Sequence, residues 1–176
     1  MFTKQGDSGN KINIKRITLY ALLTAVCLVV SYLESVLSIS LVAIAPGAKL
    51  GLSNAVALTL ICMGDKKGAW AVNVVRICLL ALLFGSPISF LLSLSGGVAS
   101  TAIACVLSRS NNVSVIGISI AGAVTHNVFQ LLAAFFIVGF GVAFYAPILI
   151  LLGALCGAFC GFLARIIIKR SKVLKV

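Results

Sequence analysis

Arg76 is a charged residue inside an apolar run, and its position raises the first chemical question. It lies eight residues into the stretch from Gly68 to Gly85, and Asn73 precedes it by three residues. A charge inside a bilayer is costly and marks a functional site by default. Residues three apart share one face of a helix, so Arg76 and Asn73 are expected to face the protein interior. Such a pair offers hydrogen bonding and charge pairing to an anionic group.

Further polar residues lie in or beside apolar runs and are candidates for the same site. Glu34 and Lys49 flank the first expected outer connection. His126, Asn127 and Gln130 fit one polar flank of a helix. We expect a substrate-binding cavity that opens outward, is net cationic and favours an anionic or polar small molecule. Its candidate residues are Arg76, Lys49, Asn54, Asn73, His126, Asn127, Gln130 and Glu34.

Each candidate also has a structural interpretation. Glu34 and Lys49 can form an interfacial ion pair that only fixes a loop. His126 alone is more often a hydrogen-bonded core histidine than a ligand-binding one. Asn and Gln in membrane helices often join neighbouring helices, an effect worth about 1 kcal/mol or less. Arg76 can extend toward the membrane surface or bind carbonyls of a neighbouring helix. As a set on convergent faces, these residues favour a binding site.

Catalytic and cofactor motifs are absent from the sequence. It has no Walker A loop, and hence no ATP site of its own. Its three acidic residues, Asp7, Glu34 and Asp65, are far apart and do not supply the clustered carboxylates that hold magnesium on a diphosphate. No Ser/His/Asp or Cys/His set is visible, and the six cysteines lie in apolar runs as small hydrophobic residues. We therefore expect no catalytic residue, metal or cofactor, and no stand-alone enzyme.

Long apolar runs separated by short polar segments must position these residues. Hydrophobic residues make up 61% and charged residues 10% of the 176-residue chain, whereas soluble domains are typically about 25% charged. We expect an all-α integral membrane protein with a six-transmembrane-helix bundle at residues 17–168, between a basic segment (1–16) and a basic tail (169–176). The expected spans cover residues 17–37, 49–63, 68–85, 88–107, 113–138 and 142–168. The second is short for a full crossing, which needs about 20 residues, so Leu41 to Ala45 can contribute membrane-embedded, non-helical chain.

The basic residues occupy alternate connections of this arrangement. The chain has 14 basic and 3 acidic residues, a formal net charge of +11. Nearly all the basic residues lie in the N-terminal segment, the turn at Lys66 and Lys67, the turn at Arg109 and the tail. Basic loops stay on the cytoplasmic side, so we expect cytoplasmic N and C termini and a multi-pass protein of the plasma membrane. These charges suit contact with the lipid bilayer, and nucleic acid is not an expected partner.

Two stripes of small residues predict close helix contacts. Gly153, Gly157 and Gly161 follow one face of the last span, and Ala21 and Ala25 are four residues apart on the first. Small residues at this spacing let helix backbones approach closely in a membrane. For the glycines we expect helix packing within the bundle. For the alanines, docking of a partner protein is the functional alternative.

The chain after its first span carries segments that resemble a known membrane family. They are Pro46-Gly-Ala-Lys-Leu-Gly-Leu-Ser-Asn54, Arg76 with Gly85-Ser86, Ser93-Leu-Ser-Gly-Gly97, and Gly122-x-x-x-His126-Asn127-x-x-Gln130. On these residues the sequence resembles the "Gx transporter" family, which is also labelled heptaprenyl diphosphate synthase component I. The architecture is similar to that of the substrate-binding S components of energy-coupling factor (ECF) transporters.

This resemblance implies six helices, cytoplasmic termini and an outward-facing ligand pocket. In S components an Ala-x-x-x-Ala motif on the first helix docks the transmembrane coupling subunit, and Ala21 and Ala25 match it. The implied function is solute binding for an uptake transporter that is energised by separate ATPases through the ECF coupling subunit. The alternative is a non-catalytic membrane subunit of a heptaprenyl diphosphate synthase system in isoprenoid or quinone biosynthesis. A purely structural scaffold would explain the glycine stripe but not the intramembrane charges.

Overall fold

The computed structural model describes residues 14–41, 53–84, 86–110 and 112–173 of the chain, with the side chains of 15, 35–41, 84, 138 and 171–173 outside this description. Every element in these ranges is helical, which confirms the predicted all-α class. The elements are α1 (Ile14–Leu41), α2 (Asn54–Cys62), α3 (Lys66–Phe84), α4 (Pro87–Leu107), α5 (Val115–Val138), the 3-10 helix η1 (Phe140–Tyr145) and α6 (Ala146–Val173).

Among the described residues, four helical segments are long and apolar enough to cross a membrane: Arg16–Glu34, Pro87–Leu107, Val115–Ile137 and Phe140–Arg170. The predicted spans at residues 49–63 and 68–85 are not among these four segments, and each has a physical reason. Helix α2 has nine residues, about 14 Å of helix, whereas a bilayer core is about 30 Å thick. Helix α3 has 19 residues but carries three basic side chains. The six-span count therefore stays a prediction.

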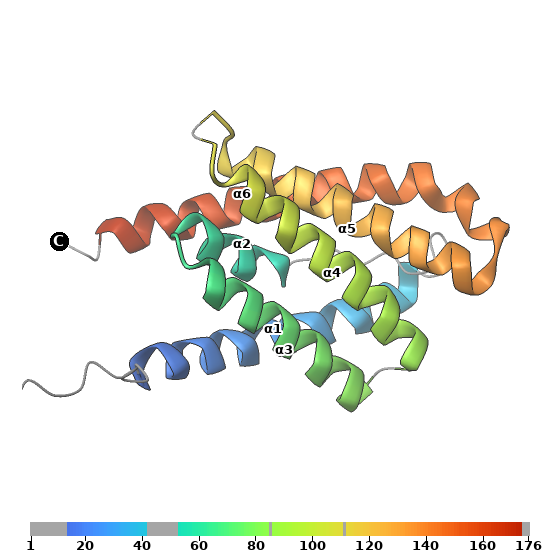
Figure 1. Cartoon of the computed structure of the whole chain (residues 1–176), viewed down its shortest axis with the longest axis horizontal. Coiled ribbons are helices and arrows are strands. Elements are labelled where there is room, and N and C mark those ends of the chain that lie inside the picture. The colour runs from blue at the N-terminus through green and yellow to red at the C-terminus, as the bar shows by residue number, and fades with distance from the viewer. Residues whose placement is uncertain (1–13, 42–52, 85, 111, 174–176) are drawn as a thin grey trace, which may run out of the picture.

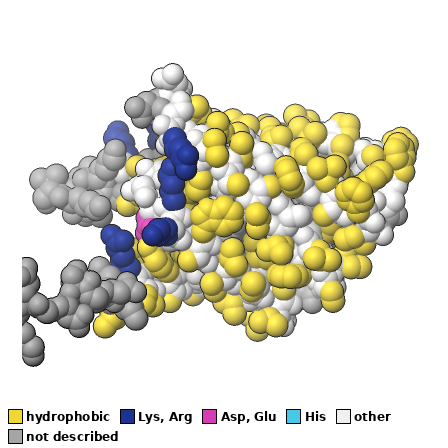
Figure 2. Space-filling view, viewed as in Figure 1, with side chains coloured by type: hydrophobic (Ala, Val, Ile, Leu, Met, Phe, Trp, Pro, Cys, Tyr) yellow, Lys and Arg dark blue, Asp and Glu magenta, His cyan; other side chains and the backbone are white. Residues whose placement is uncertain are grey.

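One end of the bundle gathers most of the charged side chains of the described residues. The start of α1, the α2–α3 turn, the α4–α5 turn and the end of α6 all lie at this end (Figure 1). Lys and Arg side chains collect there beside an acidic one, while apolar side chains cover most of the rest of the visible surface (Figure 2). We call this the basic end of the bundle.

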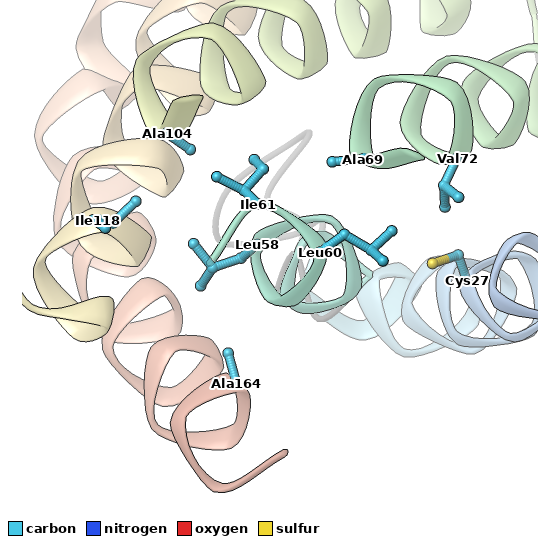
Figure 3. Close-up of a cluster of buried hydrophobic side chains, with 9 residues drawn as sticks. All are labelled: Cys27, Leu58, Leu60, Ile61, Ala69, Val72, Ala104, Ile118 and Ala164. Carbon is cyan, nitrogen blue, oxygen red and sulfur yellow. The ribbon is translucent and has the colours of Figure 1, made fainter. Parts of the chain in front are cut away.

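Helix α2 lies in the middle of the bundle and touches each of the other five α-helices. Leu58, Leu60 and Ile61 of α2 belong to a buried cluster to which every α-helix contributes (Figure 3). Helix α1 is peripheral by comparison, because within the described part of the chain it packs only on α2 and α3.

The turn from α2 to α3 fixes the basic end of α1. Gly64 adopts a positive φ of 92° that ends α2, and Asp65 then caps α3 by accepting a hydrogen bond from the Gly68 amide at 3.0 Å. The Tyr20 hydroxyl donates to the other oxygen of the same carboxylate. This bond from Tyr20 holds the pKa of Asp65 below its usual range. A single ionised side chain therefore joins α1 to the start of α3.

Helices α5 and α6 pack through the glycine stripe. A Cβ at Gly157 would lie 2.9 Å from the Ile120 Cα, and one at Gly161 would lie 2.8 Å from the Ile116 Cα. A Cβ at Gly153 would lie 2.5 Å from the Asn127 amide nitrogen. Such short distances to the backbone of α5 and to the Asn127 amide leave no space for a side chain at these glycines. The three positions therefore set how closely α5 and α6 approach.

We predict that Gly157→Ala destabilises the protein by about 1–3 kcal/mol, because the added methyl group must push two backbones apart. Gly141→Ala is the matched control, since a Cβ there meets nothing within 4 Å. Unfolding in detergent, followed through the fluorescence of Trp70, measures both. Equal stability of the two variants would contradict the proposed packing role.

Candidate functional site

The Arg76 guanidinium is buried, with 7% of the residue exposed, and both of its terminal nitrogens donate hydrogen bonds. Nη1 donates to the hydroxyl of Ser53 and, at 3.4 Å, to that of Ser31. Nη2 donates to the side-chain carbonyl of Asn73 at 2.8 Å and to that of Asn54 at 3.4 Å. A buried charge costs free energy unless it is hydrogen-bonded, and acceptors from α1, the start of α2 and α3 meet this requirement together.

Asn73 extends these contacts to a fourth helix. Its amide nitrogen donates to the Gly97 carbonyl at 3.1 Å and to the Thr101 hydroxyl at 2.8 Å, both on α4. Gly97 has no side chain to interfere, and a Cβ there would lie 2.5 Å from the Ile77 side chain. We call Arg76, Asn73, Asn54, Ser53, Ser31 and Thr101 the Arg76 network.

Helix α1 turns one face with several polar side chains inward. Among the described side chains of α1, the buried ones are Thr24, Cys27, Ser31 and Glu34, at helical spacing along one face. The opposite face exposes apolar residues, Leu22, Val26, Val29 and Leu33. Glu34 is 3% exposed and acts electrostatically on Arg76. Polar groups inside and apolar groups outside are the expected distribution for a helix whose outer face meets lipid.

A cavity of about 60 Å³ lies between α2, α4, α5 and α6. Its polar lining consists of amides, hydroxyls and one imidazole, from Asn54, Ser100, Thr101, Ser119, His126 and Asn127. Asn54 and Thr101 are members of the Arg76 network as well as of the cavity wall. The charged network and the cavity are therefore adjacent and share two residues.

The structure places the predicted site residues in two neighbouring groups. Arg76, Asn73 and Asn54 lie together with Glu34 close by, while His126 and Asn127 line the cavity. His126 packs against Gly96 of α4. A Cβ at Gly96 would lie 2.8 Å from the backbone carbonyl oxygen of His126.

The remaining predicted residues lie apart from these groups. Gln130 is buried but does not line the cavity, and its side-chain oxygen has no hydrogen-bond partner among the described residues. Lys49 falls outside the described residues. Ala21 and Ala25 are exposed on α1.

Asn127 has a structural contact in addition to its place in the cavity wall. Its amide nitrogen donates to the Leu149 carbonyl of α6 at 2.6 Å. Gly153 makes space for this amide, since a Cβ there would collide with it. Asn127 thus joins α5 to α6 as interhelical polar residues often do.

Several hydroxyl residues of the site were not predicted from the sequence. Ser31, Ser53 and Thr101 bind the charged or amide groups of the network, and Ser100 and Ser119 line the cavity. Serine and threonine are common in membrane helices, so their type alone gives little information. Their spacing was the available signal, because Ser31 lies three residues before Glu34 and Thr101 lies four after Gly97.

The fold and this site define an apolar helical bundle of the membrane-protein class, with a buried cation and a polar interior. The described residues contain no group of three or more histidine, cysteine or acidic side chains suited to a metal ion. The chain belongs to the heptaprenyl diphosphate synthase component I family, whose model matches residues 23–167. This confirms the resemblance that the sequence motifs indicated. No curated protein and no solved structure matches the chain.

We predict that Arg76→Lys lowers stability by about 2 kcal/mol although it keeps the charge. One ammonium cannot replace two nitrogens that donate to four acceptors on separate segments, and lost hydrogen bonds to a charged group cost about 1.5–3 kcal/mol. Arg109→Lys is the control, because Arg109 is exposed at the basic end and should tolerate the change within about 0.5 kcal/mol. If unfolding in detergent shows Arg76→Lys to be as stable as Arg109→Lys, the network does not depend on the guanidinium geometry.

Proposed function

We propose that this chain is a non-catalytic, membrane-embedded subunit that binds a small polar or anionic solute for uptake, in the manner of an S component. The observation that carries the proposal is Arg76, a buried cation whose partner Asn54 forms part of a cavity wall. Energy for transport would come from separate ATPases acting through a coupling subunit.

The composition of the Arg76 network supports solute binding over a purely structural role. Its four hydrogen-bond acceptors are neutral, so they solvate the guanidinium without cancelling its charge. Glu34 supplies a negative charge nearby, and Lys49 is the predicted second cation of the site. Replacing a buried ionic group by apolar residues is often neutral or stabilising, so stability alone does not require an arginine here.

The arrangement of the helices supports a six-span topology. Helix α3 has 19 residues, about 28 Å of helix, and its inward-facing arginine does not meet lipid. Helix α2 starts inside the bundle and runs toward the basic end. Basic residues favour the cytoplasmic side, so the basic end and both chain termini are proposed to face the cytoplasm of a plasma-membrane protein.

The outer face of α1 is the proposed contact for the coupling subunit. Ala21 and Ala25 are exposed there, and the apolar residue Leu22 beside them is 62% exposed. Small residues at this spacing permit close approach of a partner helix.

We expect native mass spectrometry of the protein purified in mild detergent to detect a retained small molecule. Arg76→Ala should reduce the retained fraction at least about tenfold, the equivalent of losing one charge-assisted hydrogen bond. Arg109→Ala is the control, since Arg109 is exposed, and this variant should retain the small molecule as the wild type does. Retention that is equal in Arg76→Ala and wild type, at a temperature where both are folded, would remove Arg76 from the binding site.

The family supports a second candidate function. Its description names component I of heptaprenyl diphosphate synthase, and the chain's scattered acidic residues do not suit a catalytic subunit that binds magnesium diphosphate. The second candidate is therefore a non-catalytic membrane subunit of such a synthase.

Reconstitution with a soluble prenyl synthase in lipid vesicles tests this second candidate. If the second candidate function is right, adding the protein should change the synthase rate or the product chain length at least about twofold relative to empty vesicles. Rates and products that match those of the empty vesicles would exclude it.

A further inference from the structure

The cavity between α2, α4, α5 and α6 changes chemistry along its length. Helix α2 contributes Asn54 at the end far from the basic end and Ile61 at the near end, a separation of about 10 Å along the helix. Helix α5 repeats this order, with Asn127 at the far level and Ile118 at the near level, about 13 Å away. Two independent walls therefore run from polar to apolar in the same direction.

Helix α4 follows the same gradient. Helix α4 contributes Thr101 to the polar level and Ala104, one turn closer to the basic end, to the apolar level. Leu58, Ile61, Ala104 and Ile118 turn toward one another in the near part of the cavity (Figure 3). Ser119 is the hydroxyl residue of this apolar level, and α6 adds Cys160 to it.

We infer that the ligand of this cavity is an amphiphile, with an anionic head at the level of Asn54 and Thr101 and a short apolar tail that points toward Ile61 and Ile118. This inference rests on the proposed solute-binding function and specifies its substrate class. The head lies against two members of the Arg76 network, so the positive charge of Arg76 is directly behind it. The tail displaces water from an apolar surface, which is favourable, whereas a polar tail would lose its hydration there without replacement.

The size of the cavity shows that binding requires helix movement. Its volume of about 60 Å³ is well below that of a cavity that holds benzene, which is about 150 Å³. The walls are built largely from small residues, Ala57, Ala104, Gly122, Ala123, Gly153 and Gly157. Because small side chains do not interlock, the width of the cavity is set by the separation of the helices. Ala104 lies at the apolar end and is 6% exposed, so a larger residue there would occupy the space of the tail.

The test uses defined probes on the purified full-length protein. Butyrate and hexanoate carry one carboxylate and an apolar tail, and succinate carries a carboxylate at each end. Binding is measured by the shift of thermal unfolding with probe concentration. Hexanoate should bind about tenfold more tightly than butyrate, because it buries two more methylene groups, and succinate should bind more weakly than either.

Ala104→Leu locates the tail, and Ala102→Leu is its control because Ala102 is exposed on the same helix. In Ala104→Leu the tenfold preference for hexanoate over butyrate should disappear, while Ala102→Leu keeps it. If Ala104→Leu does not fold, Ala57→Val places a smaller obstruction in the same cavity and should reduce the same preference.

Four results would overturn the inference. Succinate that binds as tightly as hexanoate, or a chain-length preference that survives in Ala104→Leu and Ala57→Val, refutes the amphiphile. A retained natural ligand that depends on Arg76 but is polar throughout refutes it while leaving solute binding intact. If neither a retained molecule nor any probe binds, both the inference and the proposed function fail.

Discussion

The burial of the Arg76 charge is the constraint on which the arrangement of the first four helices depends. A guanidinium inside an apolar bundle must be hydrogen-bonded, because the free energy of an unsolvated charge there is prohibitive. Its acceptors come from three segments, α1, the start of α2 and α3, and Asn73 connects them to α4. Moving any one of these helices would leave a buried donor without its acceptor.

The two sides of the bundle are held by different forces. On one side α1 offers Ser31 and Glu34 to the interior, so hydrogen bonds and charge position it. On the other side the glycine stripe of α6 lets α5 and α6 approach to backbone contact, so close packing positions them. The short helix α2 lies between the two sides, and the cavity opens beside it. The polar part of the cavity wall is shared with the Arg76 network, and its apolar part is shared with the buried cluster of Figure 3.

Much of this could be predicted from the sequence because the signals were local. Arg76 and Asn73, three residues apart on one helix, do hydrogen-bond to each other. The expected spans at residues 88–107 and 113–138 agree closely with α4 and α5. The second expected run, residues 49–63, is already short for a full crossing in the sequence, and its described helix, α2, has nine residues.

The partners of Arg76 on other helices depend on tertiary structure and could not be read from spacing. Ser53 lies 23 residues and Ser31 lies 45 residues from Arg76 in the sequence. Helical periodicity carries no information at such distances. Gln130 shows the same limit, because its spacing from Asn127 is helical, but only Asn127 of the two lines the cavity.

A double-mutant cycle between Arg76 and Asn73 tests most directly whether the buried charge and its acceptors act as one unit. Unfolding free energies would be measured for Arg76→Met, Asn73→Leu and the double variant in the same mixed micelles. We predict that the double variant is less destabilised than the sum of the single variants by more than about 1 kcal/mol. Each single change leaves buried polar groups without partners, whereas the double change removes the pair. Additive effects within about 0.3 kcal/mol would contradict the account, because Arg76 and Asn73 would then contribute independently.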